Sequence, residues 1–366
     1  GYTAPKILWL KQNEPANYAA LHCILLPHDY INFWLTGEKN MEYGDASGTG
    51  LLDVRKRKWC EPLCDFIDKG LTNLLPRPES SRGVTGLLRD TIRVKWGLTS
   101  SPVVSAGGGD NMMGAIGTGN IQEGVVTASL GTSGTLYSYD KEPVTDKEGE
   151  VAAFCDSTDG WLPLVCTMNV TVATEQVRHL FAWDHNGLEE AVANTAPGAE
   201  GLLFLPYLNG ERTPNLPNGN GILHGLNTRN MTAPHVARAI TEGATMGLAY
   251  GLKRFRGLGV TPSEIRLTGG GSRSPTWRQI CADVFGVPTV CLKSSEGAAL
   301  GAAVQALWAH EHANGRPVKL SQLTDRLVKL DEKTRSEPDR EAMELYKGLQ
   351  ARQMDLTRKL HAAGYV

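Results

Sequence analysis

Three stretches of the chain begin with a short run of apolar and β-branched residues and end in a glycine-rich turn: 101–110, 124–135 and 264–272. This pattern predicts a short buried strand that leads into a tight loop. After the first and third stretches, the spacing of the apolar residues changes to that of a helix. Three glycine loops at strand ends indicate a ligand site, because α/β proteins bind ligands at the carboxyl ends of their strands.

Helical spacing covers much of the remaining sequence, and Pro, Ser and Gly residues mark several helix ends. We expect helices at Asn17–Leu26, at Asp29–Thr36, from Pro234 to Gly257 with Thr232 as N-cap, from Ser274 to Gly286, from Glu296 to His310 with Ser294 or Ser295 as the cap, and from Glu337 onward. The mixture of strands and helices predicts an α/β fold. The sequence is helix-rich and aromatic before residue 116 and strand-rich after it, so we expect a domain boundary there.

Composition narrows the possible partners. The chain has 366 residues and a formal net charge of −2, which suggests about two domains and no basic surface for nucleic acid or an anionic membrane. Its longest apolar stretch, Gly297–Ala309, is shorter than the ~20 residues of a membrane span. No signal-peptide pattern begins at Gly1, so we expect a cytoplasmic protein. The 7 cysteines lack the spacing of a zinc site, and we expect them to be reduced.

Several common catalytic motifs are absent. The chain has no Gly-Lys dipeptide, hence no Walker A loop, and it has no HExxH, no GxSxG and no strand–GxGxxG–helix unit. Its glycine loops can still hold phosphate, because bare backbone N–H groups surround an anion without a Cβ in the way. In the loop Ser129–Thr135 the hydroxyls of Thr132, Ser133 and Thr135 add donors.

Asp110 is the one acid in its glycine loop, at a strand end and an expected helix start. It fits two interpretations. As an N-cap it would accept hydrogen bonds from the first turn of the helix 111–116. As a general base it would stay ionised near the helix N-terminus and accept a proton from a substrate.

Longer motifs resemble those of the FGGY family of carbohydrate kinases. The opening segment, 1–13, fits the first family signature, and 221–242 fits the second, with Thr241 as its poorest match. The Gly-Gly-Gly-Asp-Asn sequence of 107–111 is similar to that of the xylulokinases in this family, as are Leu205–Pro214 and Gly269–Pro275. The resemblance covers essentially the whole chain.

This resemblance implies the two-domain actin-like ATPase fold, of ribonuclease H type, with the active site in the interdomain cleft. Residues 1–116 would then belong to the sugar-binding domain and 117–366 to the nucleotide-binding domain. The implied reaction is the phosphorylation of D-xylulose by ATP with Mg²⁺, and the family suggests a homodimer. The implied roles fall on Asp110 as base and sugar contact, Asn111 as sugar contact, Gly131, Thr132 and Ser133 around the phosphates, and Gly270, Gly271 and Ser272 as a nucleotide shelf.

The chain departs from the family pattern at its front, where family members carry somewhat more than a hundred further residues with a first phosphate loop and most sugar contacts. We therefore expect that the sequence as written is not a competent kinase on its own. Three alternatives stay open: a sister kinase for another pentulose, a polyol or a sugar acid; a truncated, non-catalytic binder of sugar or nucleotide; and an actin-like chaperone or filament subunit. The last has no reason to carry Asp110-Asn111.

Four further polar residues receive structural interpretations. The neighbours Glu211 and Arg212 are interpreted as a structural ion pair in a loop near the cleft. Asp45 is interpreted as an Asx-type turn or cap in its own loop, near the sugar pocket of the family. His28 stands next to Asp29 and can pair with it.

Overall fold

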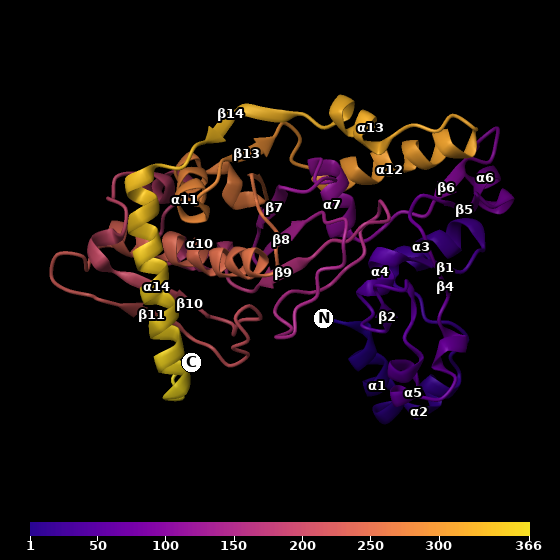
Figure 1. Ribbon diagram of the computed structural model, residues 1–366, viewed down its shortest axis with the longest axis horizontal. Coiled ribbons are helices and arrows are strands. Elements are labelled where there is room, and N and C mark those ends of the chain that lie inside the picture. The colour runs from indigo at the N-terminus through magenta and orange to yellow at the C-terminus, as the bar shows by residue number, and fades with distance from the viewer.

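The computed structural model describes residues 1–366 and shows two parts, a smaller one on the right of Figure 1 and a larger one on the left. The smaller part consists of helices and two-stranded sheets from the first third of the chain. Its elements are α1 (Thr3–Asn13), α2 (Pro15–Ala19), α3 (Pro27–Thr36), β1 (Asn40–Glu42), α4 (Tyr43–Ser47), β2 (Leu52–Asp53), β3 (Lys58–Trp59), α5 (Glu61–Ile67), the 3-10 helix η1 (Leu71–Leu74), β4 (Arg77–Glu79), β5 (Val84–Leu87), α6 (Asp90–Lys95) and β6 (Val103–Ser105).

The larger part is built on one six-stranded sheet with the order β14-β13-β12-β7-β8-β9. Its elements are α7 (Asp110–Thr118), β7 (Val125–Leu130), β8 (Gly134–Ser138), β9 (Leu164–Thr167), α8 (Thr171–Leu180), α9 (His185–Ala193), η2 (Ala199–Gly201), β10 (Leu203–Pro206), β11 (Gly221–His224), α10 (Ala233–Gly257), β12 (Glu264–Thr268), η3 (Gly270–Arg273), α11 (Pro275–Phe285), β13 (Thr289–Leu292), α12 (Gly297–Ala313), α13 (Leu320–Leu327), β14 (Leu330–Ser336) and α14 (Arg340–Ala362). Strand β12 is parallel to β7 and β13, whereas β8 is antiparallel to its two neighbours β7 and β9.

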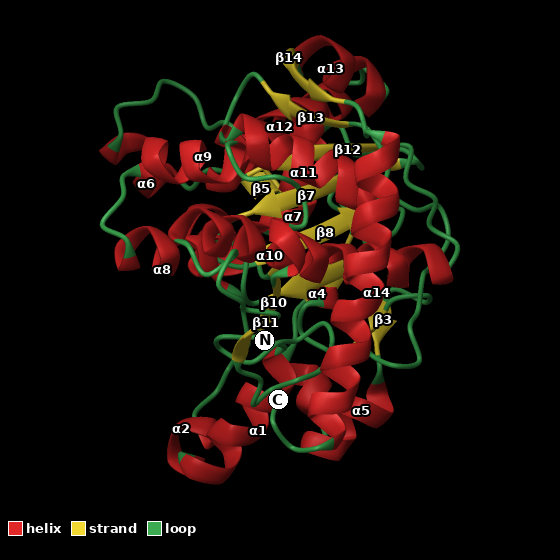
Figure 2. Cartoon of the chain, turned by 90° about the vertical axis from the view of Figure 1, so that its left-hand side faces the viewer, coloured by secondary structure: helices red, strands yellow, loops and turns green.

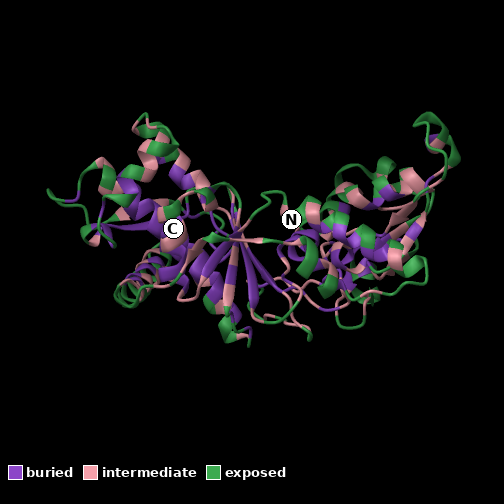
Figure 3. Ribbon diagram, turned by 90° about the horizontal axis from the view of Figure 1, so that it is seen from above, coloured by how far each residue is buried: buried purple, intermediate pink, exposed green.

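Helices cover both faces of this sheet (Figure 2). One face packs on α8, α10 and α11 through a large apolar cluster that includes Leu136, Leu248 and Phe255. The other face packs on α7 and α12 through a second cluster that includes Tyr137, Ile116 and Trp308. Buried residues are accordingly concentrated along the strands (Figure 3). None of the helices combines the length and the apolar character needed to cross a membrane.

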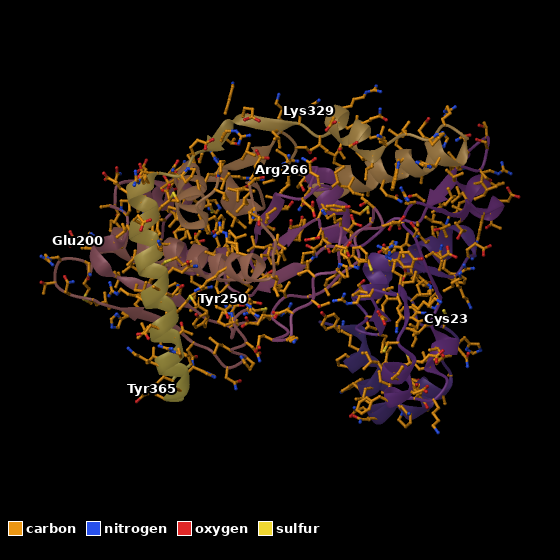
Figure 4. All side chains as sticks on the ribbon, in the orientation of Figure 1. Cys23, Glu200, Tyr250, Arg266, Lys329 and Tyr365 are labelled. Carbon is orange, nitrogen blue, oxygen red and sulfur yellow. The ribbon has the colours of Figure 1, made fainter.

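Two contacts hold α7 and α12 in place. The guanidinium of Arg266 on β12, labelled in Figure 4, donates to the carbonyl of Thr118 at the end of α7. The buried side chain of Gln305 on α12 donates to the carbonyl of Ser81 in the smaller part. Helix α12 therefore packs on α7 at one end and contacts the smaller part through its middle, and α7 carries Asp110 at its first position.

Most of the expected elements are present. The strands expected at the three glycine loops are β6, β7 and β12, and α10 and α11 begin and end close to the expected residues. The helix expected at Asn17–Leu26 is wrong beyond α2, because Ile24 donates to the carbonyl of Leu74 and Leu26, which precedes a proline, is extended. The capping serine expected for α12 is also wrong, since the N-cap residue is Glu296.

Candidate active site

The loops that were expected to bind nucleotide lie at one edge of the large sheet. Strands β7, β9 and β12 run in the same direction, so their carboxyl ends, and the segments 131–133, 168–170 and 269–273 that follow, meet at this edge. Such an edge is where ligands bind in α/β folds. The sheet thus brings Gly131 and Gly270 to the same edge, although they lie 139 positions apart in the sequence (270 − 131).

Backbone hydrogen bonds fix the first of these loops. The carbonyl of Gly131 accepts from the Thr171 N–H at 2.9 Å, and the carbonyl of Thr132 accepts from the Val170 N–H at 3.1 Å. Both bonds anchor the loop to the start of α8. The side chains of Thr132 and Ser133 remain exposed, so their hydroxyls can face an anion at the edge of the sheet.

The second loop, with Gly270, Gly271 and Ser272, forms η3 directly beside the first. Gly269 has a φ of +83°, and a Cβ on it would lie 2.7 Å from the carbonyl carbon of Leu130, so the two backbones touch and only glycine fits. Gly270 and Gly271 line a cavity of about 470 Å³ whose other walls come from α8, α9, α10 and α11. A cavity of this size accepts a small molecule such as a nucleoside.

Asp110 is the first residue of α7, and its side chain is exposed. The N-cap position belongs to Gly109, so the capping interpretation of Asp110 is wrong. The carboxylate accepts only from its neighbour Asn111, through the backbone N–H at 2.8 Å and the amide at 3.1 Å. Burial raises the pKa of Tyr137 on β8, and the negative charge of Asp110 adds to the rise. Asp110 therefore lies over the face of the sheet that carries Tyr137, with one carboxylate oxygen free of protein donors.

A polar network that the sequence did not reveal supports the loop before Asp110. The His28 Nδ1 lies 2.7 Å from Asp45 Oδ2 and its Nε2 lies 2.7 Å from the carbonyl oxygen of Ala106. Both partners are acceptors, so both ring nitrogens carry hydrogen and the ring is positively charged. Burial lowers the pKa of His28, but the bonds to Asp45 and Ala106 outweigh it and raise the pKa to about 9.

Carboxylates surround this histidine. Asp29 Oδ1 lies 3.2 Å from the His28 Nδ1, as the sequence suggested, and burial raises the pKa of Asp29 to about 7. Asp45 is not the Asx-type turn expected from the sequence, because Glu42 caps α4 and the Asp45 carboxylate turns to His28. A Cβ on Gly109 would lie 2.7 Å from Asp45 Oδ1, so this network reaches the residue before Asp110. His28, Asp29 and Asp45 form the one cluster with metal-ligand spacing, but both His28 nitrogens already donate, which does not suit a cation.

The expected ion pair between Glu211 and Arg212 is absent. The buried carboxylate of Glu211 accepts from the backbone N–H groups of Met168 at 2.7 Å and Arg212 at 2.8 Å, and from the Asn169 amide at 3.2 Å. Burial raises the pKa of Glu211. The Arg212 side chain is exposed and its guanidinium contacts the sulfur of Cys166 at 3.5 Å. The two adjacent side chains point in different directions, because the buried Glu211 carboxylate accepts hydrogen bonds from backbone N–H groups and the Arg212 guanidinium lies at the surface.

Comparison with known proteins finds matches to both parts of the chain. The C-terminal domain profile of the FGGY family of carbohydrate kinases matches residues 126–310, and the N-terminal domain profile matches residues 1–117. A xylulose kinase from Haemophilus influenzae is 45% identical over 341 residues, which are 93% of this chain and 68% of that protein. A xylulose kinase from Bacillus subtilis is 36% identical, over 84% of this chain and 62% of that protein. The chain spans 61% to 69% of the length of the curated relatives that it matches.

Solved structures show the same fold. A xyloylose kinase from Brucella ovis superposes with a TM-score of 0.91 at 30% identity and covers 99% of this chain and 73% of its own. A gluconate kinase from Lactobacillus acidophilus superposes with a TM-score of 0.90 at 25% identity, over 98% of this chain and 72% of its own. The two-domain actin-like ATPase fold is therefore confirmed.

Proposed function

Because the chain belongs to the FGGY family of carbohydrate kinases, we propose that it takes part in the ATP-dependent phosphorylation of D-xylulose to D-xylulose 5-phosphate. The relatives named above are xylulose kinases at up to 45% identity, which supports this sugar. The observation that carries the proposal is Asp110, an exposed carboxylate at the start of α7 with one oxygen free to receive a proton.

In the proposed reaction the hydroxyl of the sugar loses its proton to the Asp110 carboxylate, and its oxygen forms a bond to the γ-phosphorus of ATP. The bond between this phosphorus and the β–γ bridging oxygen breaks, and the electron pair leaves with ADP. Phosphoryl transfer needs little covalent help from protein, so positioning and charge neutralisation supply most of the rate enhancement. Mg²⁺ bound to the ATP substrate would supply further neutralisation of the phosphate charge.

We assign the two substrates to different loops. The exposed hydroxyls of Thr132 and Ser133 with Gly131 would contact the phosphates. Gly270 and Gly271, which line the 470 Å³ cavity, would border the adenosine together with the adjacent Ser272. The sugar would lie on the other side, against Asp110 and Asn111, with residues 1–116 as the sugar-binding part and 117–366 as the nucleotide-binding part. A cytoplasmic location and a homodimer are further predictions.

The experiment is Asp110→Asn in the natural protein, assayed for ADP release with D-xylulose across a wide range of Mg²⁺ concentrations. Loss of a general base typically costs on the order of 10²–10⁴-fold in rate. The structure shows that Asp110 does not cap α7, and Asn preserves its size, so we expect a folded variant that still binds nucleotide. A kcat within a few-fold of the parent would contradict the assignment. A panel with gluconate and polyols separates xylulose from the substrates of sister kinases.

A further inference from the structure

Arg212 is an exposed cation that no carboxylate neutralises. Its guanidinium contacts the Cys166 sulfur at 3.5 Å and forms no salt bridge. Most other arginines whose guanidinium is held in place pair with an acid, as Arg254 does with Asp146 at 2.7 Å. An oriented guanidinium without an anion is suited to bind one from solution, because its planar fork of N–H donors matches phosphate geometry.

The backbone of Arg212 is tied to the loop that we assign to the phosphates. The buried Glu211 carboxylate accepts from the N–H of Arg212 and from the N–H of Met168. Two residues after Met168, the N–H of Val170 donates to the carbonyl of Thr132 at 3.1 Å. Glu211 thus fixes the position of Arg212 relative to the segment that binds the Thr132 carbonyl. Three hydrogen bonds offset the cost of removing the Glu211 carboxylate from water.

The guanidinium lies over the same face of the sheet as Asp110. Cys166 pairs with Thr135 on β8, and two residues along the strands Leu164 pairs with Tyr137. Residues two apart on a strand share a face, and they are separated by roughly 7 Å. Tyr137 and Leu164 belong to the apolar cluster under α7, and Cys166 packs against it. Arg212 therefore occupies this face next to the turn 131–133, while Asp110 approaches it from α7.

A phosphoryl group that passes from nucleotide to sugar must cross this region with its negative charge. Neither the loop 107–111 nor the loop 129–135 contains a lysine or an arginine. We propose that Arg212 is a further catalytic residue, whose guanidinium contacts the γ-phosphoryl group and neutralises the charge that develops on it during transfer. The inference rests on the proposed kinase reaction, and Arg212 changes no bond: Asp110 takes the proton and ADP leaves with the electron pair, as above.

The test compares Arg212→Gln and Arg212→Lys with the parent in the natural protein. We expect kcat with D-xylulose to fall on the order of 10²–10³-fold for Gln, as when one oriented donor is removed from a transition state, and less for Lys, which keeps the charge without the fork. Calorimetry should show weaker binding of a non-hydrolysable ATP analogue and unchanged binding of ADP, because only the former has a γ-phosphate. Added guanidinium ion should restore part of the activity of Arg212→Gln.

Arg352→Gln is the matched control, since Arg352 is an exposed arginine on α14 without a salt bridge. We expect it to leave kcat and both affinities unchanged. Turnover of Arg212→Gln within a few-fold of the parent, or equal weakening of ADP and the ATP analogue, would overturn the assignment. A parent protein that does not phosphorylate D-xylulose would instead refute the proposed function, so the two failures are distinct.

Discussion

Helices α7 and α12 pack so closely that one added methyl group at their contact is expected to push them apart. A Cβ on Gly301 would lie 1.7 Å from the carbonyl oxygen of Met113 and 2.7 Å from the nitrogen of Gly117. On the other helix, a Cβ on Gly117 would lie 1.7 Å from the carbonyl oxygen of Gly297. The obstructing atoms are backbone, so no change of rotamer can relieve the contact, and Gly301→Ala must push the helices apart.

The size of the effect follows from two opposing terms. A non-bonded carbon and oxygen need at least about 3 Å, so the contact falls short by more than 1 Å, and overpacking of this kind typically costs about 1–3 kcal/mol and occasionally more. Alanine inside a helix regains about 1 kcal/mol relative to glycine. Because backbone cannot yield easily, we expect Gly301→Ala to lower the free energy of unfolding by about 2 kcal/mol or more.

Urea unfolding followed by circular dichroism measures this change, and Gly348→Ala is the control. Gly348 lies inside α14 with no atom within 4 Å of the position of a Cβ, so alanine there should stabilise the protein by up to about 1 kcal/mol. Since α7 begins with Asp110, the displaced helix should also lower kcat in protein that remains folded. If Gly301→Ala unfolds at the same urea concentration as Gly348→Ala, the close packing of these helices is refuted.

Two further predictions concern the loops of the site. Thr132→Val keeps the shape of the side chain and removes one hydroxyl donor, so we expect a higher KM for ATP and nearly unchanged sugar affinity by calorimetry; equal damage to both would show that Thr132 is structural. His28→Gln removes an imidazolium whose pKa is raised from 6.5 to about 9, so its contribution to stability, roughly 3 kcal/mol, is fully present below pH 6.5 and lost as the pH rises through 9. The difference in unfolding free energy between parent and variant should therefore shrink over that window, and a constant difference would argue against a charged His28.

The sequence predicted those features that depend on neighbours a few residues away. Strand β12 occupies Glu264–Thr268 as expected, and Ser274 caps α11 by accepting from the Trp277 N–H at 2.9 Å. Both follow from local rules: apolar β-branched residues favour a strand, and a serine before a proline-led turn satisfies a free helix N–H. The family motifs around Asp110 were equally readable, because they are contiguous in the chain.

Predictions from local sequence patterns were wrong where a residue far away in the chain forms a contact that overrides the local preference. Asn17–Leu26 has helical composition, but the Ile24 N–H bonds to Leu74 fifty positions away, and that contact takes the segment out of the helix. Glu211 and Arg212 are adjacent opposite charges, yet the buried carboxylate accepts from the Met168 backbone N–H and the Asn169 side-chain amide, which lie in the segment after β9.

Only the tertiary structure could reveal the network of His28, because its partners Asp45 and Ala106 are 17 and 78 positions away. The same holds for the contact of Gly301 with Met113, which joins two helices across 188 positions (301 − 113). Periodicity, caps and turns act within one or two helical turns, whereas burial and charge pairing depend on which elements meet once the sheet has assembled. The role proposed for Asp110 was therefore predicted from contiguous sequence, whereas the packing of distant elements decided the contacts of His28 and of Arg212.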